Sequence, residues 1–182
     1  YSDGTIDVEF VLKPRLRLGA FELPRFGATM IMQDEFDKVE YYGLGEKENY
    51  SDFDAHSRLG IYTVPVGKFE DKYIKPQESG SRGKVRWAEV TNDAGEGLIV
   101  TAVDKPLMIK ASKNYVEDFM RAKHREDMRD RNITNLHIDG FMYGIGSNSC
   151  GPGPFAPHTL KIGNKPLSFK VRLKPIRVAN QK

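Results

Sequence analysis

Alternating apolar and polar side chains dominate this chain and indicate β-strands. In IDVEFVL, residues 6–12, the apolar residues at positions 6, 8, 10 and 12 share one face. The same two-residue period recurs at 30–32, 84–88, 135–139 and 168–173, and residues 98–103 are predicted as the return strand of a hairpin. Each run predicts a strand with one buried face. Short strands joined by long connections rich in Gly, Pro, Asn and Asp predict an all-β sandwich or barrel.

A hairpin is the clearest local prediction. TNDAGEG, residues 91–97, supplies turn-forming residues between the runs at 84–88 and 98–103. In the first of these runs Val85 and Trp87 alternate with three other residues, so both are predicted to face the core.

One segment, NYVEDFMRAKHRED at 114–127, follows a helical period instead. Its residues on one helical face are Val116, Phe119, Met120 and His124. Asn114 suits the N-cap, and Glu117 and Asp118 suit the positive N-terminal end of a helix. The prediction is one short amphipathic helix laid across a sheet.

Composition and charge limit the classes of protein to which this chain can belong. The chain has 182 residues, 39% hydrophobic and 29% charged, with a net charge of +3, as expected for one soluble domain over residues 1–182. A single cysteine excludes an internal disulfide framework, and no apolar run is long enough to span a bilayer. The most basic stretch, residues 121–131, mixes five Lys or Arg with three acids, which argues against nucleic acid.

The first residue is Tyr1 and no signal peptide is visible, so we expect a piece of a longer parent protein. A cytoplasmic location is favoured, and a periplasmic or secreted one stays open.

Common catalytic motifs are incomplete. The G-x-G starts at Gly43 and Gly144 lack a third glycine and a following helix, so no nucleotide site is predicted. His124 and Glu126 form H-x-E without a following P-C-x-x-C, so no zinc site is predicted. A nucleophilic Cys150 would need a neighbouring base, and an inert small residue is the favoured interpretation.

Carboxylates and aromatic rings gather in GLGEKENYSDFD, residues 43–54. Such a mixture is how proteins hold sugars, because hydroxyls bond to charged acceptors and C–H faces stack on rings. The alternative is a turn-rich loop whose acids bind backbone amides, and the pattern alone favours it. The residues in question are Glu46, Glu48, Asp52 and Asp54 with Tyr50 and Phe53.

Five ordered blocks resemble the C-terminal, small-chain domain of the large β-galactosidases of glycoside hydrolase family two. They are LPRFGATMIM, VEYYGLGEKENYSD, RLGIY, KYIKPQESGSRGKVRW and NLHIDGFMYGIGSNSCGPGP. The resemblance runs from about Leu23 to Leu173.

It implies a supersandwich of antiparallel sheets similar to galactose mutarotase, with one short helix and truncated at its N-terminal side. It also implies that the two catalytic glutamates lie in a separate (β/α)8 barrel domain, so this segment has no catalytic residue. No cofactor or metal is expected in the segment. Any Mg²⁺ or Na⁺ is expected in the catalytic domain of the parent enzyme. Expected partners are that barrel domain and a β-galactoside, and exposed sheet edges predict self-association of the isolated piece.

The resemblance also gives a meaning to the loop after Tyr143. In the family this loop carries a tryptophan that reaches the catalytic pocket and stacks on the aglycone half of the substrate. Here Cys150 stands at that position, preceded by Asn148 and Ser149. These three residues are the predicted substrate-binding residues of an aglycone-side loop. A thiol offers much less apolar area than an indole and no stacking face. The natural substrate of the parent enzyme could therefore be a sugar other than lactose.

Three hypotheses follow. The chain is the C-terminal domain of a β-galactosidase, the same domain of a family-two enzyme acting on another β-glycoside, or a non-catalytic carbohydrate-binding module.

Overall fold

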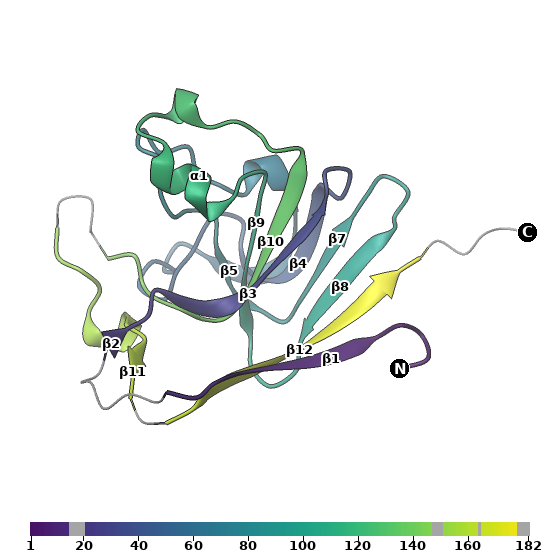
Figure 1. The fold of residues 1–182 in the computed structure, drawn as a ribbon, viewed down its shortest axis with the longest axis horizontal. Helices are drawn as coiled ribbons and strands as arrows, with labels where there is room; N and C mark the ends of the chain where they lie inside the picture. Colours follow the sequence, from purple (N-terminus) through teal and green to yellow (C-terminus); the bar gives the residue numbers. More distant parts are fainter. Residues whose placement is uncertain (15–20, 147–150, 164, 178–182) are drawn as a thin grey trace, which may run out of the picture.

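Two antiparallel sheets make up almost the whole fold (Figure 1). The computed structural model describes residues 1–14, 21–146, 151–163 and 165–177. The predicted all-β class with one short helix is confirmed. Within the described ranges, no helix is long and apolar enough to cross a membrane.

The larger sheet has six strands in the order β1-β12-β8-β7-β4-β5. They are β1 (Ile6–Leu12), β12 (Leu167–Ile176), β8 (Gly97–Ala102), β7 (Trp87–Thr91), β4 (Lys38–Gly45) and β5 (Arg58–Pro65). The strand predicted near the start pairs with the one predicted near the end, so that Phe10 lies opposite Phe169. The predicted hairpin is present as β7 and β8, joined through residues 92–96.

The smaller sheet has four strands in the order β3-β10-β9-β6, and a third pair joins β11 to β2. The strands are β3 (Arg25–Gln33), β10 (Ile133–Met142), β9 (Leu107–Ser112), β6 (Arg82–Val85), β11 (Lys161–Ile162) and β2 (Phe21–Glu22). The helical pieces are α1 (Val116–Arg121) and the 3-10 turns η1 (Val66–Lys68), η2 (Arg125–Asp127) and η3 (Ala156–His158).

The inner faces of both sheets form one apolar core, with Phe169 joining them. Phe169 is fully buried, stacks on Phe10 with ring centroids 4.8 Å apart, and meets the Phe26 ring edge-on at 5.4 Å. Gly140 makes room for it, because a Cβ there would lie 2.2 Å from the ring. Complete burial of such a ring stabilises the fold by about 1.5–3 kcal/mol.

The chain changes sheet between β6 and β7. Val85 ends a strand of the smaller sheet, and Trp87 begins a strand of the larger one. In β7 the side chains of Ala88 and Val90 are fully buried, while Trp87 is half-buried. The prediction that Val85 and Trp87 share one buried face is therefore wrong, because the crossing at Arg86 resets the two-residue period.

The predicted helix is present but shorter than its sequence period. α1 ends at Arg121, because the Asp127 carboxylate accepts the N–H groups of Lys123 and His124 at 2.9 Å each and starts a new turn. The predicted apolar face is only partly covered: Phe119 is half-buried, but Met120 is 77% exposed.

The N-terminal cap also differs from the prediction. Tyr115 is the N-cap residue, and its N–H donates to the Asp118 carboxylate at 3.0 Å. The predicted cap, Asn114, is buried instead and donates from its side chain to the carbonyl of Arg129 at 2.6 Å. Asn114 therefore closes the loop after α1.

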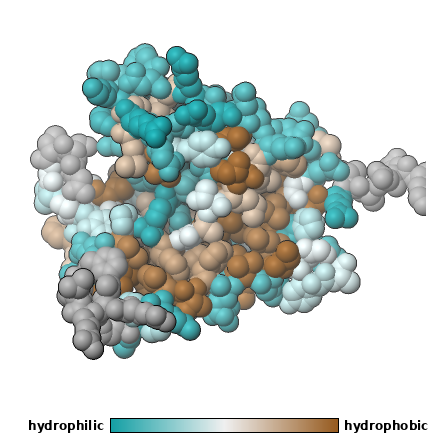
Figure 2. Space-filling model, in the orientation of Figure 1, coloured by the Kyte–Doolittle hydropathy of each residue, from teal (hydrophilic) through white to brown (hydrophobic). Residues whose placement is uncertain are grey.

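Apolar side chains gather along β3 and the β12–β1 pair, and Figure 2 shows them on the face that contains these strands. β1 and β3 each lie at the edge of their sheet. Met30 and Phe10 are only half-buried against the core, and Ile6 is 59% exposed. Within the described residues, these two edges carry apolar surface that no neighbouring strand covers.

Candidate functional site

The loop that follows β10 leaves the sheet at a fixed base. The N–H of Tyr143 donates to the carbonyl of Pro24 at 2.8 Å, and the N–H of Gly144 donates to that of His158 at 2.7 Å. These two bonds hold the first loop residues against segments far away in the sequence.

The Asp52 carboxylate clamps the same base. It accepts the N–H groups of Ile145 at 3.0 Å and Gly146 at 2.6 Å. Gly144 allows this approach, because a Cβ there would lie 2.6 Å from the carboxylate. Gly146 has φ +59°, and a Cβ on it would lie 2.9 Å from the nitrogen of Pro154, so the two arms of the loop meet at this glycine. We call Asp52 with Gly144–Gly146 the loop clamp.

The predicted substrate-binding residues belong to this loop. Asn148, Ser149 and Cys150 lie outside the described residues, and their role stays a prediction. The described flanks, Gly146 and Gly151, are both exposed.

The acidic block before Asp52 connects loops through backbone bonds. The Glu48 carboxylate is buried, accepts the N–H of Gly80 at 2.6 Å and also accepts the Tyr73 hydroxyl. Asn49 accepts the N–H of Gly83 at 2.7 Å and donates to the carbonyl of Leu44 at 3.1 Å. These contacts match the interpretation of the block as a turn-rich loop whose side chains bind backbone amides.

The other acidic members of that block and Phe53 are half-buried or exposed. Asp54 pairs with Lys84 at 3.2 Å, and the Phe53 ring lies 4.7 Å from that of His56. Glu46 is exposed.

A second polar cluster covers the outer face of the smaller sheet. Asn135, His137 and Asp139 alternate along β10 with the core residues, and Lys110 lies opposite His137 on β9. All four are buried, His137 to 3% exposure. A strand face that alternates with the core was expected to meet solvent, but here it is covered by other segments of the chain.

Ion pairs connect this cluster to the segment before β6. Arg25 binds Asp139 at 2.6 Å and Glu78 at 3.4 Å, and Lys110 lies 3.4 Å from Glu70 and 3.6 Å from Glu78. The paired charges compensate one another in a place where an isolated charge would be costly.

Burial controls protonation here. Burial raises the pKa of Asp139, opposed by the Arg25 guanidinium, and raises that of Glu70, opposed by Lys110. Burial, reinforced by the positive charges of Arg25 and Lys110, lowers the pKa of His137 to about 3. His137 is therefore neutral near pH 7.

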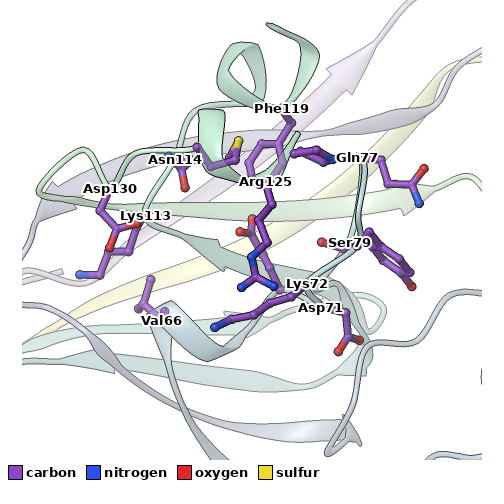
Figure 3. A pocket seen from close by; sticks show the side chains of 15 residues that line it. Val66, Asp71, Lys72, Gln77, Ser79, Lys113, Asn114, Phe119, Arg125 and Asp130 are labelled. Atoms are coloured by element: carbon purple, nitrogen blue, oxygen red, sulfur yellow. The ribbon is translucent and has the colours of Figure 1, made fainter. Parts of the chain in front are cut away.

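A cavity of about 290 Å³ opens beside this cluster, between the 66–79 segment and the loop that carries α1 and η2 (Figure 3). The described residues contain no group of three or more His, Cys, Asp or Glu side chains that could hold a metal ion.

Comparison with known proteins identifies the family. Residues 1–173 match the family described as beta galactosidase small chain. The chain belongs to the β-galactosidase small-chain family. Related β-galactosidases include that of Actinobacillus pleuropneumoniae, 35% identical over 152 residues, 84% of this chain and 14% of that protein. Those of Staphylococcus xylosus and Kluyveromyces lactis are 29% identical over 172 residues (94% and 17%) and 28% over 141 (77% and 13%).

The chain thus spans between 13% and 17% of the length of these three relatives. The small-chain match includes the loop clamp and both sheets, except for the last three residues of β12. It confirms the resemblance drawn from the five sequence blocks and supports a glycosidase parent.

Proposed function

We propose that residues 1–182 form the C-terminal domain of a β-galactosidase that releases terminal non-reducing β-D-galactose. In this proposal the retaining reaction and its two glutamates belong to another domain, together with any Mg²⁺ or Na⁺. This domain stabilises the assembly and closes the aglycone side of the active site with the loop after Tyr143.

The loop clamp is the observation that supports this role. A loop that completes a site on another domain must leave the sandwich in one direction, and preorganisation reduces the cost of ordering it. The two bonds from Ile145 and Gly146 to Asp52 fix both backbone donors next to the predicted contact residues. Asn148, Ser149 and Cys150 would then reach the aglycone.

Complementation tests the proposal. The parent polypeptide ending just before Tyr1 is assayed for aryl-galactoside hydrolysis alone and after addition of this chain. Activity only in the mixture is the expected result. Full activity of the truncated parent, or none in either sample, would contradict the assembly role.

A second candidate is the same domain in an enzyme acting on another β-glycoside, and Cys150 favours it. Cys150→Trp would supply an indole for stacking. We expect the variant to shift the parent's preference toward lactose relative to aryl galactosides. Cys150→Ser serves as the control that removes the thiol without adding a ring. An unchanged preference in Cys150→Trp would refute the stacking argument.

The apolar edges of β1 and β3 support self-association of the isolated chain. Sedimentation velocity over a range of concentrations should show dimers or larger species. A monomer at the highest concentration would contradict this proposal.

A further inference from the structure

The cavity in Figure 3 lies outside the loop clamp, and none of its described lining residues comes from the loop after Tyr143. Two separate segments form its walls. Residues 66–79 supply one side, and residues 113–130, with α1 and η2, supply the other. Its volume of about 290 Å³ is close to the lower limit of small-molecule sites, about 300 Å³.

One buried hydroxyl in the wall lacks an internal hydrogen-bond partner. Ser79 is 1% exposed, and its hydroxyl makes no hydrogen bond with the part of the chain that the structure describes. The neighbouring Glu70 carboxylate is paired within the chain, since its Oε1 lies 3.4 Å from Lys110 Nζ. Buried polar groups normally have partners, so the Ser79 hydroxyl calls for a hydrogen-bonding molecule in the cavity.

Four charged side chains also line the cavity without forming ion pairs among the described residues: Asp71, Lys72, Arg125 and Asp130. Figure 3 shows Arg125 and Lys72 extending into the same space from opposite walls. Because the two cations are balanced by two anions, a simple ion would meet repulsion from half of them. A ligand hydroxyl suits both kinds of group, since it donates to carboxylates and accepts from Arg and Lys.

An aromatic ring completes the wall. Phe119 on α1 borders this cavity and also an adjoining one of about 290 Å³, which reaches the exposed Met120. Lys110 Nζ lies over one face of this ring, 4.8 Å from its centroid, and the ring borders both spaces. Donors, acceptors and an aromatic platform together suit a ligand with hydroxyls on its edges and C–H groups on its face.

We propose that this cavity binds a neutral β-linked oligosaccharide, at a site separate from the one closed by the loop. Its ring faces lie on Phe119, and its hydroxyls reach Ser79, Glu70 and Arg125. The choice of a galactoside rests on the proposed function, whereas the saccharide class rests on the cavity itself.

Peptide-resolved hydrogen exchange on the full-length polypeptide tests the site. The probe is thiodigalactoside, whose sulfur linkage resists hydrolysis, and inorganic phosphate is run in parallel. We expect thiodigalactoside to protect peptides from residues 66–80 and 113–131. Ser79→Ala and Arg125→Gln should each weaken this protection about five- to tenfold in ligand concentration. Arg121→Gln, an exposed neighbour that does not line the cavity, should leave it unchanged.

Three results would overturn the inference. They are no protection at saturating thiodigalactoside, protection by phosphate but not by the sugar, and protection that neither variant weakens. Aryl-galactoside hydrolysis by the same sample separates this site from the proposed function. Hydrolysis without protection removes only the cavity site, whereas protection without hydrolysis leaves the cavity site standing and removes the galactosidase assignment.

Discussion

Acid should destabilise this chain through His137. The side chain is 3% exposed on the outer face of the smaller sheet, and burial with two nearby cations lowers its pKa from 6.5 to about 3. The folded state therefore keeps a neutral ring, while the unfolded chain takes up a proton as the pH falls below about 6.5. Above pH 6.5 the imidazole is neutral in both states and does not lower the free energy of unfolding. Between pH 6.5 and about pH 3 the free energy of unfolding falls progressively, because only the unfolded chain takes up the proton.

The magnitude follows from the window between these two values. Each pH unit within it changes the free energy of unfolding by about 1.4 kcal/mol. Between pH 7 and pH 5 the loss is about 2 kcal/mol, a substantial part of the roughly 5–15 kcal/mol that stabilises a domain. Asp139 and Glu70 act in the opposite direction, because a carboxyl with a raised folded pKa takes up its proton first in the folded state.

A variant separates these contributions. Urea unfolding of wild type and His137→Asn is measured at pH 7, 6 and 5. The loss of unfolding free energy between pH 7 and pH 5 should be about 2 kcal/mol larger in wild type, since both proteins retain the same carboxyls. An equal pH dependence in the two proteins would refute the assignment of a buried neutral imidazole.

Three further perturbations have defined outcomes. Arg25→Met leaves the buried Asp139 carboxylate without its cation and should lower the free energy of unfolding in urea by about 3–5 kcal/mol. A loss below about 1 kcal/mol would contradict the ion-pair network. Phe169→Ala should cost about 3–5 kcal/mol in the same assay, whereas the exposed neighbour Lys170→Ala should stay within about 0.5 kcal/mol. Asp52→Ala removes two charge-assisted hydrogen bonds, which together contribute about 2 kcal/mol after allowance for partial exposure. The variant should therefore be cleaved within residues 143–155 about 30-fold faster in limited proteolysis. An unchanged rate would show that the clamp does not hold the loop.

The strands β1 and β12 were predictable from the sequence, and β9 was not. β1 and β12 have a clear two-residue period because their outer side chains meet solvent. β9 has five buried residues among its six and so carries almost no alternation. The end of α1 also had no visible signal, because it depends on the Asp127 carboxylate capturing two N–H groups beyond the helix.

The candidate sites divide in the same way. The glycines at 144 and 146 were visible in the sequence. Asp52, which accepts the N–H groups of Ile145 and Gly146, is 93 and 94 positions away from them, so no local pattern joins the loop to its partner. Asn135 and His137 have the two-residue spacing of a solvent-facing strand face. They are buried only because segments that are distant in the sequence cover this face. The role of Cys150 came from the family resemblance alone, because the residue pattern around it indicates only an irregular loop.

The pairing of β1 with β12 has a consequence for synthesis on the ribosome. The two strands are joined by partners such as Asp7 and Arg172, 165 positions apart, and among the described residues β12 is the only strand that hydrogen-bonds to β1. At about 5–20 residues per second, β1 leaves the ribosome roughly 8–30 s before its partner is made. During that interval it is an unpaired strand open to other chains. A polypeptide that stops before β12 therefore loses its first strand as well as its last, and Phe10 loses the ring on which it stacks.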